Sequence, residues 1–294
     1  MRLITRGDMD GLACAVIFTS HEDISEILLV HPQDITDNRI EVTGDDILAN
    51  LPYHPNAGVW FDHHLLTESN RAPEGEFKGR YGQAPSAAAL VWEYYGKEPR
   101  YERLIAETNR LDSAQLTEED VKDPQDHILL GYTIDSRTGL GAFKDYFRQC
   151  VEWVKELPIE EVLEQPQVVE RIRRIREADQ DFRKKLLAFS RLEGNVVFTD
   201  FREEEALPVG NRFLVYTLFP EANVSVRVHW GPEHRFAVVA VAHSIFNRTC
   251  QTKVGELMAR YGGGGHHGAG STPIPVDEAE EKIAEILATL QANG

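Results

Sequence analysis

The chain has 294 residues, 42% of them hydrophobic, and its 48 acidic against 31 basic side chains give a formal net charge of −17. This length and apolar content suit one large domain or two ordinary ones, and the sequence holds neither an apolar run of roughly 18 residues that could cross a membrane nor a signal region. The negative charge opposes binding to long nucleic acid, although it can also serve solubility alone. We therefore expect a soluble, cytoplasmic, globular protein whose nucleotide ligands, if it has any, are short.

The first 158 residues alternate short apolar runs with helical patterns, which is typical of a parallel α/β sheet. Acidic turns follow several of the runs, and open α/β sheets bind their ligands at the carboxyl ends of their strands. We therefore predict an N-terminal parallel-sheet domain over residues 1–158. Its expected strands lie around Leu3 and at residues 27–30, 46–49 and 59–61, and its expected helices at residues 11–20 and 85–92.

Residues 159–192 are strongly charged with a helical pattern, and we interpret them as a connector between two domains. Residues 193–294 mix strand and helix patterns and predict a smaller, mixed α/β domain. The predicted apolar stripe of the connector is Val162, Val169, Ile172, Ile175 and Phe182. The second domain is predicted to have strands at residues 196–199, 213–218, 224–228 and 236–241, and helices at residues 253–261 and from 276 to the end.

The three cysteines, Cys14, Cys150 and Cys250, are far apart and outside any Cys-x-x-Cys pattern. Their odd number and spacing argue against a disulfide framework and a structural zinc site. We expect each to be a small buried hydrophobic residue.

Asp8 and Asp10 lie one residue apart in the turn Arg6-Gly7-Asp8-Met9-Asp10-Gly11, which ends the first strand. In a tight turn both carboxylates can approach one hard cation, and their oxygens suit manganese or magnesium. Such a turn is more often capping and turn chemistry than a metal site. Asp10 could instead cap the helix that follows it.

A second motif, Asp62-His63-His64, follows the predicted strand at residues 59–61. Each imidazole can bind a metal or a phosphoryl oxygen. The run is rare by chance, and its alternative is a surface turn that contains histidines. Asp112 adds a further acid beside a basic residue and would signify nothing alone.

The most specific segment is Gly262-Gly263-Gly264-Gly265-His266-His267. Successive glycines leave backbone N–H groups unobstructed, so such a loop can cradle an anion without side-chain clashes. A flexible linker is the alternative, but linkers rarely carry paired histidines. Upstream, Arg248 supplies a guanidinium suited to bidentate contact with a phosphate.

Together and in this order, these segments resemble the DHH phosphoesterase family with a C-terminal DHH-associated domain, and its exopolyphosphatase-related group in particular. The resemblance implies a catalytic domain over residues 1–158, a substrate-binding domain over residues 193–294 and an active cleft between them. It also implies a hydrolase in which bound manganese, or magnesium, activates a water that attacks phosphorus. The expected substrate is an oligophosphate, a short oligonucleotide, a dinucleotide or a nucleotide 3′-phosphate. Long duplex nucleic acid and membranes are not expected partners, and a homodimer is compatible with the resemblance.

The resemblance also assigns roles to individual residues. Asp8 would bind a first metal ion, and Asp10, His63 and Asp112 would bind a second. His64 would contact the phosphoryl group or the leaving oxygen. The distal phosphate or nucleotide would be held by Arg248, Gly262, Gly263, Gly264, Gly265 and His266.

Two positions at the first metal depart from the family pattern. Arg6 stands where a histidine is usual and has no lone pair for a metal. Asn50 stands where a bridging aspartate is expected, unless Asp45 or Asp46 serves instead, and we keep Asn50 among the candidate metal ligands. The three predicted aspartates and Arg6 sum to two negative charges, which one divalent ion fits better than two. We hypothesise that the guanidinium occupies the place of the first metal.

These departures leave two functions open. The first is an active hydrolase with one metal ion, in which Arg6 is a catalytic residue that stabilises developing charge. The second is a binding or regulatory protein that recognises a small phosphorylated ligand and has lost efficient turnover, because the attacking water depends on the replaced ligand. The completeness of the other motifs favours the hydrolase, and the net charge disfavours a nucleic-acid exonuclease.

Overall fold

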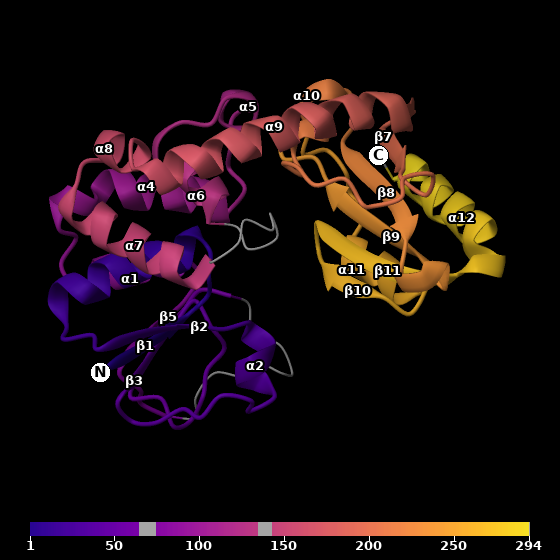
Figure 1. The fold of residues 1–294 in the computed structure, drawn as a ribbon. Coiled ribbons are helices and arrows are strands. Elements are labelled where there is room, and N and C mark those ends of the chain that lie inside the picture. Colours follow the sequence, from indigo (N-terminus) through magenta and orange to yellow (C-terminus); the bar gives the residue numbers. More distant parts are fainter. Residues whose placement is uncertain (65–74, 135–142, 294) are drawn as a thin grey trace. The chain divides into compact units, whose positions relative to one another are not determined.

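Two compact units make up the structure, a computed structural model that describes residues 1–64, 75–134 and 143–293 (Figure 1). The first unit comprises Met1–Leu116 and Pro124–Ile175, and the second comprises Thr117–Asp123 and Arg176–Gly294. The long helix α9 (Pro166–Phe189) contributes to both units. The boundaries expected at residues 158 and 192 stay predictions from the sequence.

A five-stranded parallel sheet with the strand order β2-β1-β3-β4-β5 forms the centre of the first unit. The strands are β1 (Arg2–Thr5), β2 (Glu26–Leu29), β3 (Asp46–Ala49), β4 (Val59–Asp62) and β5 (Gly79–Tyr81). β3 and β4 are buried along their whole length, as expected for a parallel sheet with both faces covered. The predicted parallel α/β sheet is confirmed.

Alternate side chains of these strands enter two apolar cores, because successive residues of a strand point to opposite faces. Leu3 and Phe61 pack with the first helix in the larger core, whereas Ile4 and Trp60 belong to a smaller core on the other face. The helices of this unit are α1 (Met9–His21), α2 (Pro32–Thr36), α3 (Ala87–Tyr94), α4 (Glu102–Asp112), α6 (Asp126–Thr133), α7 (Phe143–Glu156) and α8 (Ile159–Leu163), with the 3-10 turn η1 (Pro99–Tyr101) before α4. α1 contacts α3, α4 and α7.

The second unit is built on a six-stranded sheet with the order β10-β11-β9-β8-β7-β6, in which β7 and β8 are parallel and the other neighbours antiparallel. Its strands are β6 (Ser190–Glu193), β7 (Val196–Asp200), β8 (Val224–Trp230), β9 (Phe236–His243), β10 (Gly264–His266) and β11 (Ala269–Pro275), and its shorter helices are α5 (Glu118–Lys122), α10 (Leu214–Leu218), α11 (Val254–Ala259) and α12 (Ala279–Ala292). α11 and α12 pack on one face of this sheet in a common apolar core. The predicted mixed α/β architecture is confirmed.

Two local predictions are wrong. Residues 213–218, predicted as a strand, contain the helix α10, because a short apolar run does not distinguish a strand from a buried helical turn. Val169, assigned to the apolar stripe, is 51% exposed, and its neighbour Val168 is buried instead. The predicted continuous helical period is interrupted between α8 and α9, which resets the phase of the stripe.

The three cysteines are free and buried, as predicted. Within the described ranges, none of the helices combines the length and apolar character that crossing a membrane requires.

Candidate metal and phosphate site

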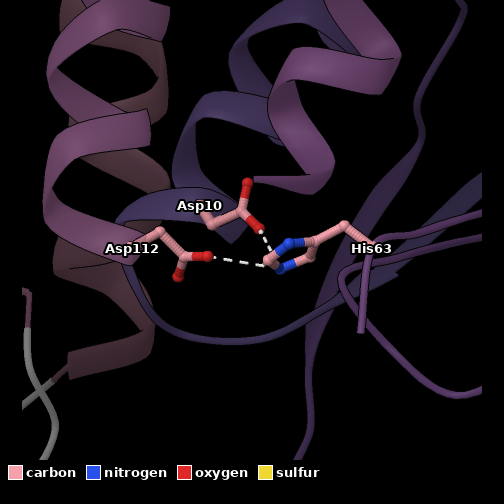
Figure 2. Close-up of side chains that lie close together, drawn as sticks. All are labelled: Asp10, His63 and Asp112. Atoms are coloured by element: carbon pink, nitrogen blue, oxygen red, sulfur yellow. Dashed lines mark ion pairs between the residues drawn. The ribbon is translucent and has the colours of Figure 1, made fainter. Parts of the chain in front are cut away.

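Three side chains from distant parts of the first unit point toward one another (Figure 2). Asp10 lies in the first turn of α1, His63 follows β4, and Asp112 is the last residue of α4. His63 Nε2 lies 3.6 Å from Asp10 Oδ2 and 3.2 Å from Asp112 Oδ2. One ligand atom from each residue lies within 4.8 Å of the others, a spacing that could hold one metal ion.

The hydrogen bonding of His63 leaves one ring nitrogen with a lone pair that is directed into the cluster and could bind a metal ion. Its Nδ1 lies 3.0 Å from the carbonyl oxygen of Ala84. A carbonyl oxygen only accepts, so Nδ1 carries the proton and Nε2 of the neutral ring keeps a lone pair. Nε2 is buried and has no hydrogen-bond partner in the described part of the chain. The cluster therefore fits a divalent cation that accepts nitrogen and oxygen ligands.

The N-terminus of α3 holds Asp10. The backbone N–H groups of Ala87 and Ala88 donate to its two oxygens at 2.9 and 2.7 Å. Asp10 therefore does not cap its own helix, which was the alternative open from the sequence. Asp8 is the capping residue of α1, and its Oδ1 accepts from Gly11 N at 3.0 Å.

Burial makes the two carboxylates of the cluster hard to ionise. It raises the pKa of Asp10 to about 6, against the opposing charge of His63. Burial, followed by the negative charges of Asp10 and Asp8, raises the pKa of Asp112 to about 8. A divalent cation would stabilise both anions, since an opposite charge within a few ångströms favours the ionised form.

Asp8, predicted to bind a first metal, lies outside this cluster and is engaged by two other predicted site residues. Its Oδ2 lies 3.1 Å from Arg6 Nε, and its Oδ1 accepts from Asn50 Nδ2 at 3.0 Å. Asn50 directs its amide group at Asp8 rather than at the cluster, and its Oδ1 is buried without a partner in the described ranges. The place of Asn50 among the candidate metal ligands stays a prediction.

The alternative that Asp45 or Asp46 serves as the bridging aspartate is wrong. Asp46 begins β3, whereas the site lies beyond the carboxyl ends of β1 and β4. Its carboxylate binds Arg2, which donates from Nε and Nη2 at 2.9 and 2.7 Å. Asp45 precedes β3 at the same end, and its carbonyl accepts from the backbone N–H of Arg2.

His64 is oriented by two residues to which the sequence assigned no role. Its Nδ1 lies 2.8 Å from Oδ1 of the fully buried Asp62, and this hydrogen bond raises the pKa of His64 against the effect of burial. Tyr81 donates from its hydroxyl to the His64 carbonyl at 3.0 Å and stacks on Trp60. The His64 side chain is 43% exposed, so Nε2 can meet a ligand.

The glycine-histidine segment of the second unit is more ordered than a loop. Gly262 and Gly263 donate their N–H groups to carbonyls at the end of α11, and Gly264–His266 forms β10, paired with β11. The linker alternative is therefore wrong, and so is the expectation that all four glycines leave their N–H groups unobstructed. His266 and Arg248 are exposed, and Arg248 Nε donates to the Ile245 carbonyl at 2.9 Å. Their substrate-binding roles stay predictions.

Comparison with solved structures shows similarity to the pGpG-specific phosphodiesterase PggH of Vibrio cholerae, with 36% identity, a TM-score of 0.89 and coverage of 100% of this chain and 99% of that one. Two structures at 14% identity share the fold. One is a DHH domain from a protein described as a member of a family of ribosomal proteins, with a TM-score of 0.67 and coverage of 99% and 86%. The other is the exonuclease RecJ bound to manganese, with a TM-score of 0.56 and coverage of 98% and 90%. No protein-family model and no curated protein matches the chain.

Proposed function

This chain belongs to the DHH phosphoesterase family and is a hydrolase, and from that premise we propose that it cleaves the phosphodiester bond of a short dinucleotide, with pGpG as the first candidate. Full-length similarity to a pGpG-specific phosphodiesterase carries the proposal. In the reaction a water oxygen bonds to phosphorus, the bond from phosphorus to the 3′ oxygen breaks, and that oxygen takes up a proton. Two mononucleotides result.

We assign one divalent cation, manganese or magnesium, to Asp10, His63 and Asp112. The orphaned Nε2 of His63, between the buried carboxylate of Asp10 and the partly exposed carboxylate of Asp112, supports this assignment. When bound, the cation supplies Lewis-acid charge and lowers the pKa of a coordinated water. Ala84 orients the imidazole and the N-terminus of α3 orients Asp10, so the ligand set is preorganised.

His64 is assigned to the phosphoryl group and the leaving 3′ oxygen. Asp62 accepts from Nδ1 and favours the protonated imidazole. Nε2 of that ring can then donate to a phosphoryl oxygen or give its proton to the 3′ oxygen as the ester bond breaks. Asp62 acts only through this ring, which it positions and keeps protonated.

The second unit is proposed to hold the distal part of the substrate through Arg248, the glycines Gly262–Gly265 and His266. A short ligand agrees with the net charge of −17, which would repel a long polyanion. The cytoplasmic location and the homodimer stay predictions.

The test is a substrate panel with the purified full-length protein. pGpG, other linear dinucleotides, longer oligonucleotides, an oligophosphate and a nucleotide 3′-phosphate are each incubated with manganese, with magnesium or with a chelator, and products are separated by chromatography. We expect metal-dependent conversion of pGpG to GMP that is lost in Asp112→Ala and kept in Glu102→Ala, an exposed carboxylate at the start of the same helix. Tight nucleotide binding without product under every condition would refute the hydrolysis of pGpG and favour the binding protein.

A further inference from the structure

The surroundings of Asp8 do not fit a second metal ion. Asp8 Oδ1 accepts hydrogen bonds from Gly11 N and Asn50 Nδ2, each at 3.0 Å, and Oδ2 faces Arg6 Nε at 3.1 Å. Both oxygens of this carboxylate are therefore occupied by donors. A second ion would have to displace the guanidinium and turn the Asn50 amide around.

We propose that Arg6, held by Asp8 and Asn50, is a built-in second cation and binds the phosphoryl group of the substrate directly. This rests on the proposed function, which supplies the phosphoryl group. The side chains of Arg6 and Asp8 are 36% and 32% exposed, so a ligand can reach them. In the described part of the chain the terminal amino groups of Arg6 make no hydrogen bond, and their planar fork matches two oxygens of a phosphate.

The positive charge of Arg6 acts electrostatically on the metal cluster. Burial dominates the raised pKa of Asp112, and Arg6 is among the charges that oppose it. Asp8, Asp10 and Asp112 against one guanidinium leave two negative charges, which a single divalent cation neutralises. Arginine keeps its charge across physiological pH and does not dissociate from the chain. This half of the site therefore needs no cation from solution.

Asn50 keeps the ion pair in place. It follows β3 with a φ of 58°, a left-handed conformation that asparagine adopts more readily than most residues, and its N–H donates to the carbonyl of Phe61. Its side chain is clamped onto Asp8 through Nδ2, while the buried Oδ1 has no partner among the described residues. A buried acceptor without a donor is unfavourable, so the contact between Nδ2 and Asp8 is kept at a cost.

Manganese stoichiometry tests the replacement without any activity measurement. Manganese alone is titrated by calorimetry into the metal-free, full-length protein. We expect one ion per chain for the wild type and two for Arg6→His/Asn50→Asp, in which an imidazole and a carboxylate join Asp8. Two tight ions in the wild type would overturn the proposal. If circular dichroism shows that the double variant is unfolded, the proposal is tested by the manganese stoichiometry of the wild type and by the binding measurement described next.

The contact with phosphate is tested by binding of pGpG to metal-free protein in a chelating buffer. Arg6→Gln should weaken binding about 10- to 100-fold, as expected for lost charge-assisted hydrogen bonds, and Arg6→Lys should restore part of it. Arg80→Gln, an exposed arginine paired with Glu93 at 3.3 Å, is the matched control and should bind as the wild type does. Equal affinity of the wild type and Arg6→Gln would overturn the proposal. Arg6-dependent binding with one manganese ion but no hydrolysis would instead refute only the proposed reaction.

Discussion

The affinity for manganese should fall steeply as the pH is lowered from 8 to 6, because protons compete with the metal for Asp10 and Asp112. Burial is the chief cause that raises the pKa of Asp10 to about 6 and of Asp112 to about 8. At pH 8 nearly all of the Asp10 carboxyl groups and about half of the Asp112 carboxyl groups would be ionised. At pH 6 about half of the Asp10 groups and roughly one in a hundred of the Asp112 groups would be ionised. The product of these fractions gives a loss of about 100-fold, or almost 3 kcal/mol.

Calorimetric titration of manganese chloride at pH 6, 7 and 8 and constant ionic strength measures this loss. Buffers of different ionisation enthalpy also report the protons released, which should be about one per ion at pH 7. In Asp112→Asn the carboxyl group of higher pKa is absent, so the weaker affinity of that variant should depend on pH much less than that of the wild type over the same range. A wild-type affinity that changes less than about threefold between pH 6 and pH 8 would refute the reasoning.

The same shifts determine the sign of the pH dependence of stability. Both carboxyl groups have a folded-state pKa above the ordinary value of 3.8. The folded chain therefore binds more protons than the unfolded chain between about pH 4 and pH 8, and these groups lower the stability of metal-free protein as the pH rises through that window. Bound manganese should remove this trend, which thermal unfolding with and without the metal at pH 5 and pH 8 would measure.

Three substitutions probe other parts of the molecule. Asp62→Asn should lower kcat for pGpG by about 10²- to 10⁴-fold and reshape the pH profile with little change in KM, because His64 loses its anionic partner; an unchanged profile would contradict this role. Asp46→Asn should cost about 2–3 kcal/mol in urea unfolding without changing kcat. Burial opposes ionisation of Asp46, yet the hydrogen bond from its arginine partner on β1 prevails and lowers its pKa, so this stability is present above about pH 4 and is lost as the pH falls through the lowered pKa. Gly263→Ala should destabilise the second unit by about 1–3 kcal/mol, since its Cβ would lie 2.2 Å from a carbonyl oxygen of β11, whereas the matched control Gly264→Ala meets nothing within 4 Å and should unfold at the wild-type temperature.

Local patterns predict the first sheet well because its buried strands are short apolar runs that end at polar turns. The run at residues 46–49 matches β3 residue for residue. Tyr216 shows where such reasoning fails. Its segment has the aromatic and β-branched composition of a strand, but the Tyr216 hydroxyl bonds Ser225 Oγ and the Ala242 carbonyl from the helix α10. Contacts with distant residues decided the conformation, and the local sequence carries no sign of them.

The sequence predicted which residues form the candidate metal site, but it did not predict the hydrogen bonds that hold them. The family resemblance implies Asp10, His63 and Asp112 as ligands of one metal ion, and the structure brings these three together. The different tasks of Asp8 and Asp10 were not predictable, because both acids stand in one turn and either could cap α1. Asp10 is held by backbone N–H groups 77 and 78 residues away, and such partners leave no pattern in the local sequence.

The segment Ala84–Ala88 links all three members of the metal cluster. The carbonyl of Ala84 fixes the His63 ring, and the N–H groups of Ala87 and Ala88 hold Asp10. The buried Ser86 caps α3 by accepting from Ala89 N and donates to Asn109 Oδ1 at 2.6 Å, one turn before Asp112 on α4. A shift at the start of α3 would therefore move all three ligands together. The small side chains of this segment let its backbone, rather than long flexible side chains, set the geometry of the site.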